Sequence, residues 1–90
     1  MDGGIAWAVV DLNTGISDGF YFDFEVAVRM RNYQRACWAG SRWELVASSS
    51  ELGLFEKCDK YLMEHRKELI ERYGEPRNVV ENEDGTVTVE

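Results

Sequence analysis

The fold is decided by the stretch IAWAVVDLNTGISDGFYF, residues 5–22. Residues 5–12 carry so few polar side chains that they predict a strand buried on both faces. The Asn-Thr-Gly sequence at 13–15 then suits a tight reversal, because these residue types accept the positive φ angles of such turns. Residues 16–22 alternate in side-chain direction as a return strand would. The stretch therefore predicts a β-hairpin.

A helix is predicted directly after this hairpin. Asp23 is placed as its N-cap, where a carboxylate can accept hydrogen bonds from the free amides of the first turn. Apolar side chains follow on one helical face, at spacings of four, three and four residues: Val26, Met30, Tyr33 and Cys37. The Ala-Gly-Ser sequence at 39–41 ends the helix, and residues 43–47 predict a third strand. A right-handed crossover between parallel second and third strands would place the first strand between them.

A second helix is predicted from the Ser-x-x-Glu capping box at 48–51. Its apolar stripe has alternating spacings of three and four residues and consists of Phe55, Cys58, Leu62, His65 and Leu69. Two acid-first pairs four residues apart support the helix, Glu56 with Lys60 and Glu68 with Arg72. Gly74 and Pro76 end it, because glycine accepts a left-handed cap and proline cannot continue a helix.

The C-terminal residues 77–90 predict a second hairpin that turns at the Asp-Gly sequence at 84–85. A two-residue loop would give the opposed pairs Val80–Val89 and Asn82–Val87. Because ninety residues suffice for one core, we expect residues 1–90 to form a single small domain of the α+β class. Its predicted order is β-β-α-β-α-β-β, with a mainly antiparallel sheet packed against two helices.

Composition sets limits on function. Apolar residues make up 44% and charged residues 30%, which is the balance of a folded globular domain. The formal net charge of −7 argues against broad binding to nucleic acid or to an anionic membrane surface. The longest apolar run, residues 5–10, is far shorter than the ~20 residues that span a bilayer, and residues 1–4 lack the features of a secretion signal. With its two cysteines, Cys37 and Cys58, on apolar helix faces, we expect a reduced, cytoplasmic protein.

Catalytic and metal-binding signatures are absent from the sequence. His65 is the only histidine, and Cys58 lies two helical turns before it, ~10 Å away, which is too far for one metal ion to bind both. We therefore expect His65 to be a partly buried side chain bonded within the core. Glu64 and Glu68 could act as an acid–base pair, but exposed helical faces usually carry such carboxylates as solvated charge. We expect no enzyme activity, no cofactor and no metal.

One stretch of the sequence is basic. Four arginines and no acid lie within residues 29–42, and aromatic residues are interleaved with them. Because arginine and aromatic side chains together suit stacking on bases and binding of phosphates, an alternative nucleic-acid site consists of Arg31, Arg35, Arg42 and Trp38. The same arginines could instead solvate the first helix, with Arg29 paired to Glu25, or receive an acidic protein.

The C-terminal part is acidic, since residues 75–90 hold five carboxylates against one arginine. A rigid hairpin that displays carboxylates can imitate nucleic-acid phosphates and occupy a basic groove on another protein. The alternative is that these charges keep an edge strand from pairing. The candidate partner-binding residues are Glu81, Glu83 and Asp84, followed by Glu64, Glu68 and Glu71 of the second predicted helix.

Aromatic residues make up 12% of the chain, which raises the question of where they lie. The sequence does not assign all of Trp7, Phe20, Phe22 and Trp43 to one core. These side chains either fill a small core or form an exposed patch for self-association or for a partner.

Three segments carry a resemblance: Val9-Val10-Asp11-x-x-Thr14-Gly15, Phe22-Asp23-x-Glu25-x-Ala27 and Arg42-Trp43-Glu44-Leu45-Val46. Together they resemble the hairpin–helix–strand units of many uncharacterised phage and prophage proteins. In size and acidity the chain is also similar to the short phage inhibitors that block host defence systems, such as anti-CRISPR proteins. Because catalytic and cofactor signatures are absent, we expect a non-enzymatic protein that inhibits a partner by occlusion. The resemblance implies that the partner is a host nucleic-acid-handling or defence complex.

The expected partner is therefore a protein with a basic surface, or a second copy of the chain. We expect neither direct binding of nucleic acid nor contact with a membrane. The alternative functions are a nucleic-acid-binding protein that uses the arginines and an oligomeric structural or assembly subunit.

Overall fold

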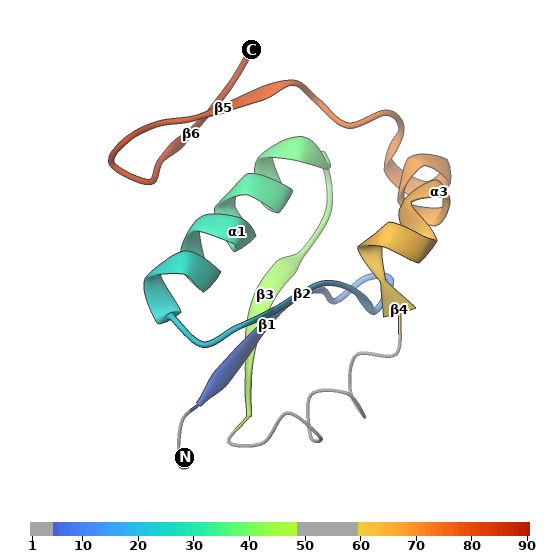
Figure 1. The fold of residues 1–90 in the computed structure, drawn as a ribbon. Helices are drawn as coiled ribbons and strands as arrows, with labels where there is room; N and C mark the ends of the chain where they lie inside the picture. The colour runs from blue at the N-terminus through green and yellow to red at the C-terminus, as the bar shows by residue number, and fades with distance from the viewer. Residues whose placement is uncertain (1–4, 49–59) are drawn as a thin grey trace.

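The computed structural model describes residues 5–48 and 60–90, which form an α+β fold (Figure 1). The elements are, in chain order, β1 (Ala6–Asp11), β2 (Ile16–Tyr21), α1 (Phe24–Cys37), β3 (Trp43–Ser48), β4 (Lys60–Tyr61), α3 (Leu62–Tyr73), β5 (Val79–Glu81) and β6 (Val87–Val89). The predicted order is confirmed, with the two-residue strand β4 added immediately before α3. Strands β1 to β4 form one sheet, and β5 and β6 form a second.

Strand β1 is central in the larger sheet, whose strand order is β3-β1-β2-β4. It pairs antiparallel with both β2 and β3, so these two strands run parallel to each other. Helix α1 connects them, and the first strand lies between the second and third, as the crossover argument predicts. Strand β4 extends the sheet beyond β2 through a short parallel pairing of Lys60 with Ile16 and Tyr61 with Ser17.

Both faces of β1 are buried. On the face that the helices cover, the core consists of Val9, Ile16, Cys37, Trp38, Trp43 and Leu69. On the opposite face, the core consists of Ala6, Ala8 and Val10, with Phe20 and Val46 packed against them. This double burial explains why β1 lacks the polar alternation of a half-exposed strand.

Strand β2 contains a bulge at Asp18. Its register with β1 shifts between Val9, which lies opposite Gly19, and Val10, which lies opposite Ser17, so Asp18 is the extra residue. Gly19 has a φ angle of 140°, a conformation that residues with a side chain rarely adopt. Because a bulge re-aims the side chain of its extra residue, it decides where the Asp18 carboxylate lies.

Asp23 caps α1 as predicted, since its Oδ1 accepts from the backbone N–H of Glu25 at 2.9 Å and of Val26 at 3.4 Å. The buried face of the first turn differs from the prediction by one position. Ala27 is buried, whereas Val26 is 41% exposed. At 3.6 residues per turn, ~100° separates neighbouring side chains, which turns Val26 off the core. The remainder of the predicted stripe contacts the core: Met30, Tyr33 and Cys37.

The second predicted helix is wrong at its start. Lys60 and Tyr61 form β4, so α3 begins only at Leu62, and its N-cap Tyr61 makes no side-chain capping bond. The backbone at Lys60 and Tyr61 pairs with β2, and groups used in a sheet ladder cannot also serve a helix. Other residues of this prediction lie outside the described residues: Glu51, Phe55, Glu56 and Cys58.

The remainder of α3 agrees better with the prediction. Leu62 and Leu69 pack in the core. Gly74 ends the helix with a φ angle of 88°, and its N–H donates to the C=O of Ile70 at 2.8 Å. Arg72, which the sequence pairs with Glu68, has its guanidinium 5.8 Å from the ring centroid of Tyr73.

The predicted register of the C-terminal hairpin is wrong by one position, because the observed pairs are Val79–Val89, Val80–Thr88 and Glu81–Val87. The loop has three residues, since the N–H of Asn82 donates to the C=O of Thr86 at 2.8 Å and the N–H of Gly85 donates to the C=O of Asn82 at 3.0 Å. Gly85, with a φ angle of 89°, supplies the left-handed residue of this loop type. The changed register places Val87 and Val89 on the same face as Val79, which packs against the core.

Candidate functional site

The acidic residues that the sequence predicts as a binding face form two separate groups. Glu64, Glu68 and Glu71 belong to α3, and Glu81, Glu83 and Asp84 belong to the β5–β6 hairpin. Figure 1 shows the tip of this hairpin and α3 on opposite sides of α1. The structure therefore does not bring these six carboxylates together on one face.

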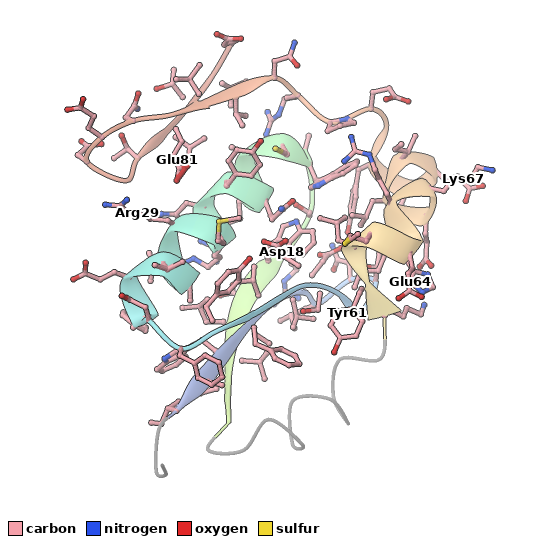
Figure 2. The ribbon with its side chains drawn as sticks, viewed as in Figure 1. Asp18, Arg29, Tyr61, Glu64, Lys67 and Glu81 are labelled. Atoms are coloured by element: carbon pink, nitrogen blue, oxygen red, sulfur yellow. The ribbon has the colours of Figure 1, made fainter. Side chains whose placement is uncertain are left out.

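The surface of α3 is mixed in charge. Glu68 carboxylate oxygens lie 3.5 Å from Nζ of Lys60 and 3.6 Å from Nδ1 of His65. His65 is partly buried, but its contact is this surface carboxylate and not the expected core group, and its φ and ψ angles of −121° and 18° interrupt the helix. Glu64 and Lys67 both project from the outer side of α3 (Figure 2). Helix α3 thus presents interspersed charges of both signs.

The hairpin tip is the acidic element. Glu83 and Asp84 are exposed, and Asp84 Oδ1 accepts from the backbone N–H of Thr86 at 3.0 Å and from its hydroxyl at 2.7 Å. These two bonds, with a smaller contribution from Arg29, hold the pKa of Asp84 below its usual value. Asp84 is therefore charged at neutral pH, whereas Glu81 points toward α1 and away from the tip (Figure 2).

Arg29 packs against the tip of the hairpin. A Cβ atom at Gly85 would lie 3.0 Å from Nε of Arg29, so the tip of the hairpin and this side chain of α1 are in close contact and a larger residue here would displace Arg29. Among the described residues, Arg29 forms no ion pair with Glu25, the pairing that the sequence offers. The contact places one positive charge beside the acidic tip and joins the hairpin to α1.

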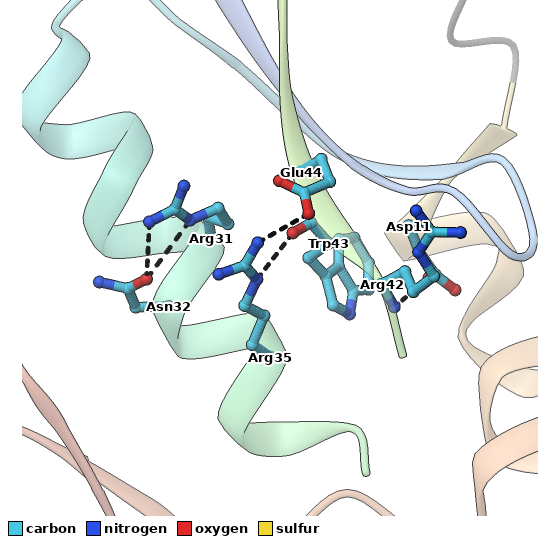
Figure 3. Close-up of polar contacts among 7 residues, drawn as sticks. All are labelled: Asp11, Arg31, Asn32, Arg35, Arg42, Trp43 and Glu44. Atoms are coloured by element: carbon cyan, nitrogen blue, oxygen red, sulfur yellow. Dashed lines mark hydrogen bonds and ion pairs between the residues drawn. The ribbon is translucent and has the colours of Figure 1, made fainter. Parts of the chain in front are cut away.

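Two arginines of the predicted basic patch bond to other residues of this chain. Arg35 donates from Nε to the C=O of Trp43 at 2.8 Å, and its Nη2 lies 2.9 Å from Oε2 of Glu44 (Figure 3). Arg31 donates to Oδ1 of Asn32 at 3.3 Å. Arg35 is thus held by β3, and the guanidinium of Arg31 by its neighbour Asn32.

The aromatic part of that patch belongs to the core. Trp38 is 2% exposed and Trp43 is 0% exposed, so neither ring can stack on a base. The backbone N–H of Arg42 donates to Oδ1 of Asp11 at 2.8 Å, while its side chain is exposed (Figure 3). The structure therefore gives Arg31, Arg35, Arg42 and Trp38 no shared binding surface.

An exposed apolar region, here called the apolar edge, lies where β1 begins and β2 ends. It comprises Ile5, Trp7, Phe22 and Phe24, and the exposed fractions are 49% for Ile5, 65% for Phe22 and 51% for Phe24. The rings of Trp7 and Phe24 meet edge to face, with their centroids 4.9 Å apart. Of the aromatic residues that the sequence left unassigned, Phe22 and Trp7 thus reach the surface; Phe24 is an exposed aromatic that the sequence reasoning missed.

A groove connects the apolar edge with the hairpin tip. Its volume is about 350 Å³, and Phe24, Val28 and Asn32 line it from α1. These residues are four apart in sequence and so lie on one helical face. The opposite wall is the tip itself, with Asp84 and Gly85. Phe24 belongs to both the apolar edge and the groove. The two therefore form one continuous apolar surface, which Asp84 borders.

A buried polar network lies beneath the C-terminal end of α1. The Nε1–H of Trp38 donates to Oε1 of Gln34 at 3.1 Å, and the hydroxyl of Tyr21 donates to Oδ2 of Asp18 at 3.2 Å. Burial raises the pKa of Asp18, and hydrogen bonds from Tyr21 and Gln34 act in the opposite direction. The raised pKa arises from burial between the sheet and α1, and the network links the bulge of β2 to the helix.

Chemically reactive groups are few in the part of the chain that the structure describes. No three His, Cys, Asp or Glu side chains in residues 5–48 and 60–90 approach closely enough to hold a metal ion. Burial raises the pKa of the Cys37 thiol, which keeps it protonated and weakly nucleophilic at neutral pH. Neither described helix is long and apolar enough to cross a membrane. No protein family, curated protein or solved structure matches the chain.

Proposed function

We propose that this chain is a protein-binding module that acts by occluding a surface of its partner. The observation that supports the proposal is the exposure of Phe22 and Phe24, 65% and 51%, beside a groove that leads to an acidic hairpin tip. Aromatic anchors at the centre and charged groups at the rim are the usual anatomy of protein interfaces.

The charges around this surface favour a partner with a basic rim. Asp23 and Glu25 alternate with the exposed phenylalanines, and Asp84 lies on the far wall of the groove. Among the described residues, Arg29 is the one cation that lines the groove. An apolar side chain of the partner would enter the groove, and lysine or arginine side chains would face the surrounding carboxylates.

The resemblance to small acidic phage inhibitors adds a second part to the proposal. A partner with a basic surface that handles nucleic acid, such as a host defence complex, would be blocked when the acidic tip occupies the site of the phosphates. The relevant carboxylates are then Glu83 and Asp84, because Glu81 points toward α1. Glu64, Glu68 and Glu71 lie on the mixed surface of α3 and would contribute little.

The experiment is affinity capture from the native host lysate with matched variants of the chain. The double variant Phe22→Ser/Phe24→Ser removes the exposed rings, and Met63→Ser is the control, since Met63 is 96% exposed on α3. Mass spectrometry should find a protein retained by the wild type and by Met63→Ser and lost with the double variant. Equal retention by all three chains would refute binding through the apolar edge.

The electrostatic part is tested with the partner so identified. The variant Glu83→Lys/Asp84→Lys should weaken binding by at least about tenfold, and added salt should weaken wild-type binding. The control Glu64→Lys/Glu71→Lys makes the same change of charge on α3 and should have a much smaller effect. Comparable losses from both variants would show that overall charge, and not the tip, directs binding.

A further inference from the structure

A second cleft opens between α1, α3 and the segment that leads into β5. Its volume is about 360 Å³, at the lower end of the range of small-molecule sites. In the part of the chain that the structure describes, it shares no lining residue with the groove beside the hairpin tip, so it does not rest on the function proposed above. Two arginines, Arg66 and Arg77, line it in a chain whose formal net charge is −7.

Arg66 reaches the cleft from α3. Its guanidinium carbon lies 5.6 Å from the centroid of the Trp38 ring, a cation–π contact. This contact is not a hydrogen bond, so it leaves N–H groups of the guanidinium available to a ligand. Within residues 5–48 and 60–90, no carboxylate forms an ion pair with Arg66.

Arg77 lies at the C-terminal end of α1. Its backbone N–H donates to the C=O of Cys37 at 2.8 Å, and its Nε donates to the C=O of Ala36 at 2.8 Å. These two bonds hold the side chain in place by one edge of the guanidinium. Its charge likewise has no ion-pair partner in the described part of the chain.

The floor of the cleft is polar, buried and already hydrogen-bonded. Gln34 and Trp38 are both buried, and the bond between Trp38 Nε1 and Gln34 Oε1 is 3.1 Å long. Arg66 and Arg77 both lower the pKa of the Cys37 thiol, against the larger effect of burial, so both charges act at the same point of the floor. A site that is built before its ligand arrives loses little conformational entropy on binding.

We propose that this cleft binds a small organic anion, a carboxylate or phosphate ester, through Arg66 and Arg77. Guanidinium groups match the planar geometry of carboxylates and the oxygens of phosphates, and they donate two parallel hydrogen bonds to one ligand group. Tyr33 and Asn78, which also line the cleft, carry neutral hydrogen-bonding groups. Glu90 lines the cleft as well and opposes an anion.

The test uses the indole N–H signals of the three tryptophans in a ¹H–¹⁵N correlation spectrum of the full chain. Sodium phosphate and sodium succinate are the two probes, with sodium chloride at equal ionic strength as the control. The Trp38 signal should shift saturably with at least one probe, because its ring lies against Arg66. The Trp7 signal should stay in place, because Trp7 packs against Phe24 at the apolar edge.

Variants separate specific binding from general attraction of anions. Arg66→Gln should raise the Kd by about tenfold or more, which corresponds to the loss of one charged hydrogen bond. Arg72→Gln makes the same change of charge on the same helix but outside the cleft, and should leave the Kd unchanged. Glu90→Gln should tighten binding, because it removes the opposing charge.

Two results would overturn the proposal. One is a Trp38 signal that moves no further with phosphate or succinate than with chloride. The other is an equal effect of Arg66→Gln and Arg72→Gln. Because Arg77 also bonds the end of α1, Arg66→Gln is the deciding variant, and an otherwise unchanged spectrum confirms that it folds.

Discussion

The hydroxyl of Tyr73 donates a hydrogen bond of 2.6 Å to Oδ2 of Asp11, a buried carboxylate that lies 62 positions earlier in the chain. Oδ2 also accepts from the hydroxyl of Thr14 at 2.9 Å, and Oδ1 accepts from the backbone N–H of Arg42 at 2.8 Å. One side chain thus joins the turn after β1, the start of β3 and the end of α3. Asp11 is a structural residue, and its burial is explained by these bonds.

The first prediction concerns the hydrogen bond between Tyr73 and Asp11. Tyr73→Phe should lower the free energy of unfolding by ~1.5–3 kcal/mol, the range for a hydrogen bond to a charged group. Asp11→Ala should cost more, because it also leaves the N–H of Arg42 without its acceptor. Urea unfolding of both single variants and the double variant forms a cycle, in which Tyr73→Phe should cost much less once Asp11 is absent. Additive effects would contradict a direct coupling.

The sequence predicts well those parts of the fold that depend on contacts between residues close together in the chain. The β1–β2 hairpin, the cap at Asp23 and the end of α3 at Gly74 all depend on neighbours in sequence. The same reasoning fails at Lys60 and Tyr61, because their strand pairing with β2 is a contact between distant segments. It fails at the register of the last hairpin because the Asp-Gly pair is compatible with both a two-residue and a three-residue loop.

The candidate sites depend still more on distant contacts. Spacing alone cannot show that Trp38 is buried beneath Arg66, since the two belong to segments joined only by packing. An exposed Phe22 is one of the alternatives that the sequence allows, but the groove at Phe24 exists only because the hairpin tip returns to α1. The separation of the acidic residues into two groups likewise follows from tertiary structure, while their charges are evident from the sequence.

The second prediction tests how the hairpin tip packs on α1. Gly85→Ala combines a left-handed backbone at φ 89° with a Cβ atom 3.0 Å from Arg29, and should destabilise by more than the ~1–2 kcal/mol of the backbone term alone. Gly15→Ala is the matched control, with φ 79° and no atom within 4 Å of the added Cβ. In an Arg29→Ala background, the excess cost of Gly85→Ala should disappear. An excess that persists without Arg29 would assign it to another contact.

The third prediction concerns alkaline pH. Burial, and then the charge and hydrogen bond of Asp18, raise the pKa of Tyr21 well above its usual range. Because the folded pKa exceeds the unfolded value of about 10, the contribution of Tyr21 to stability is complete below pH 10 and is lost as the pH rises above it. Urea midpoints measured from pH 8 to 11 should therefore fall at the alkaline end, and less steeply for Tyr21→Phe. Identical slopes would show that Tyr21 ionises as easily in the folded state.

The fourth prediction concerns Asp18 at acidic pH. Burial raises its pKa, so the ionised form is less favourable in the folded protein than in the unfolded chain. The stability that the protonated form provides is complete below the unfolded pKa of about 3.9 and declines as the pH rises through the folded value. Asp18→Asn removes this charge and should stabilise the protein at pH 7 but have little effect at pH 3. Thermal melts at the two pH values measure the difference, and a destabilised variant at pH 7 would show that the carboxylate is needed by its hydrogen-bond donors.

The last prediction separates the apolar edge from the core. Phe22 is 65% exposed and Ile16 is 0% exposed, although both are large apolar residues at the two ends of the β2 segment. Phe22→Ser should change the free energy of unfolding by no more than ~0.5 kcal/mol, as for most surface positions, whereas Ile16→Ala should cost ~2–5 kcal/mol. A large loss of stability from Phe22→Ser, measured by urea unfolding, would make this ring part of the folded core. A small loss means that folding does not require an aromatic ring at this position, so the effect of Phe22→Ser on partner binding can be measured in a folded chain.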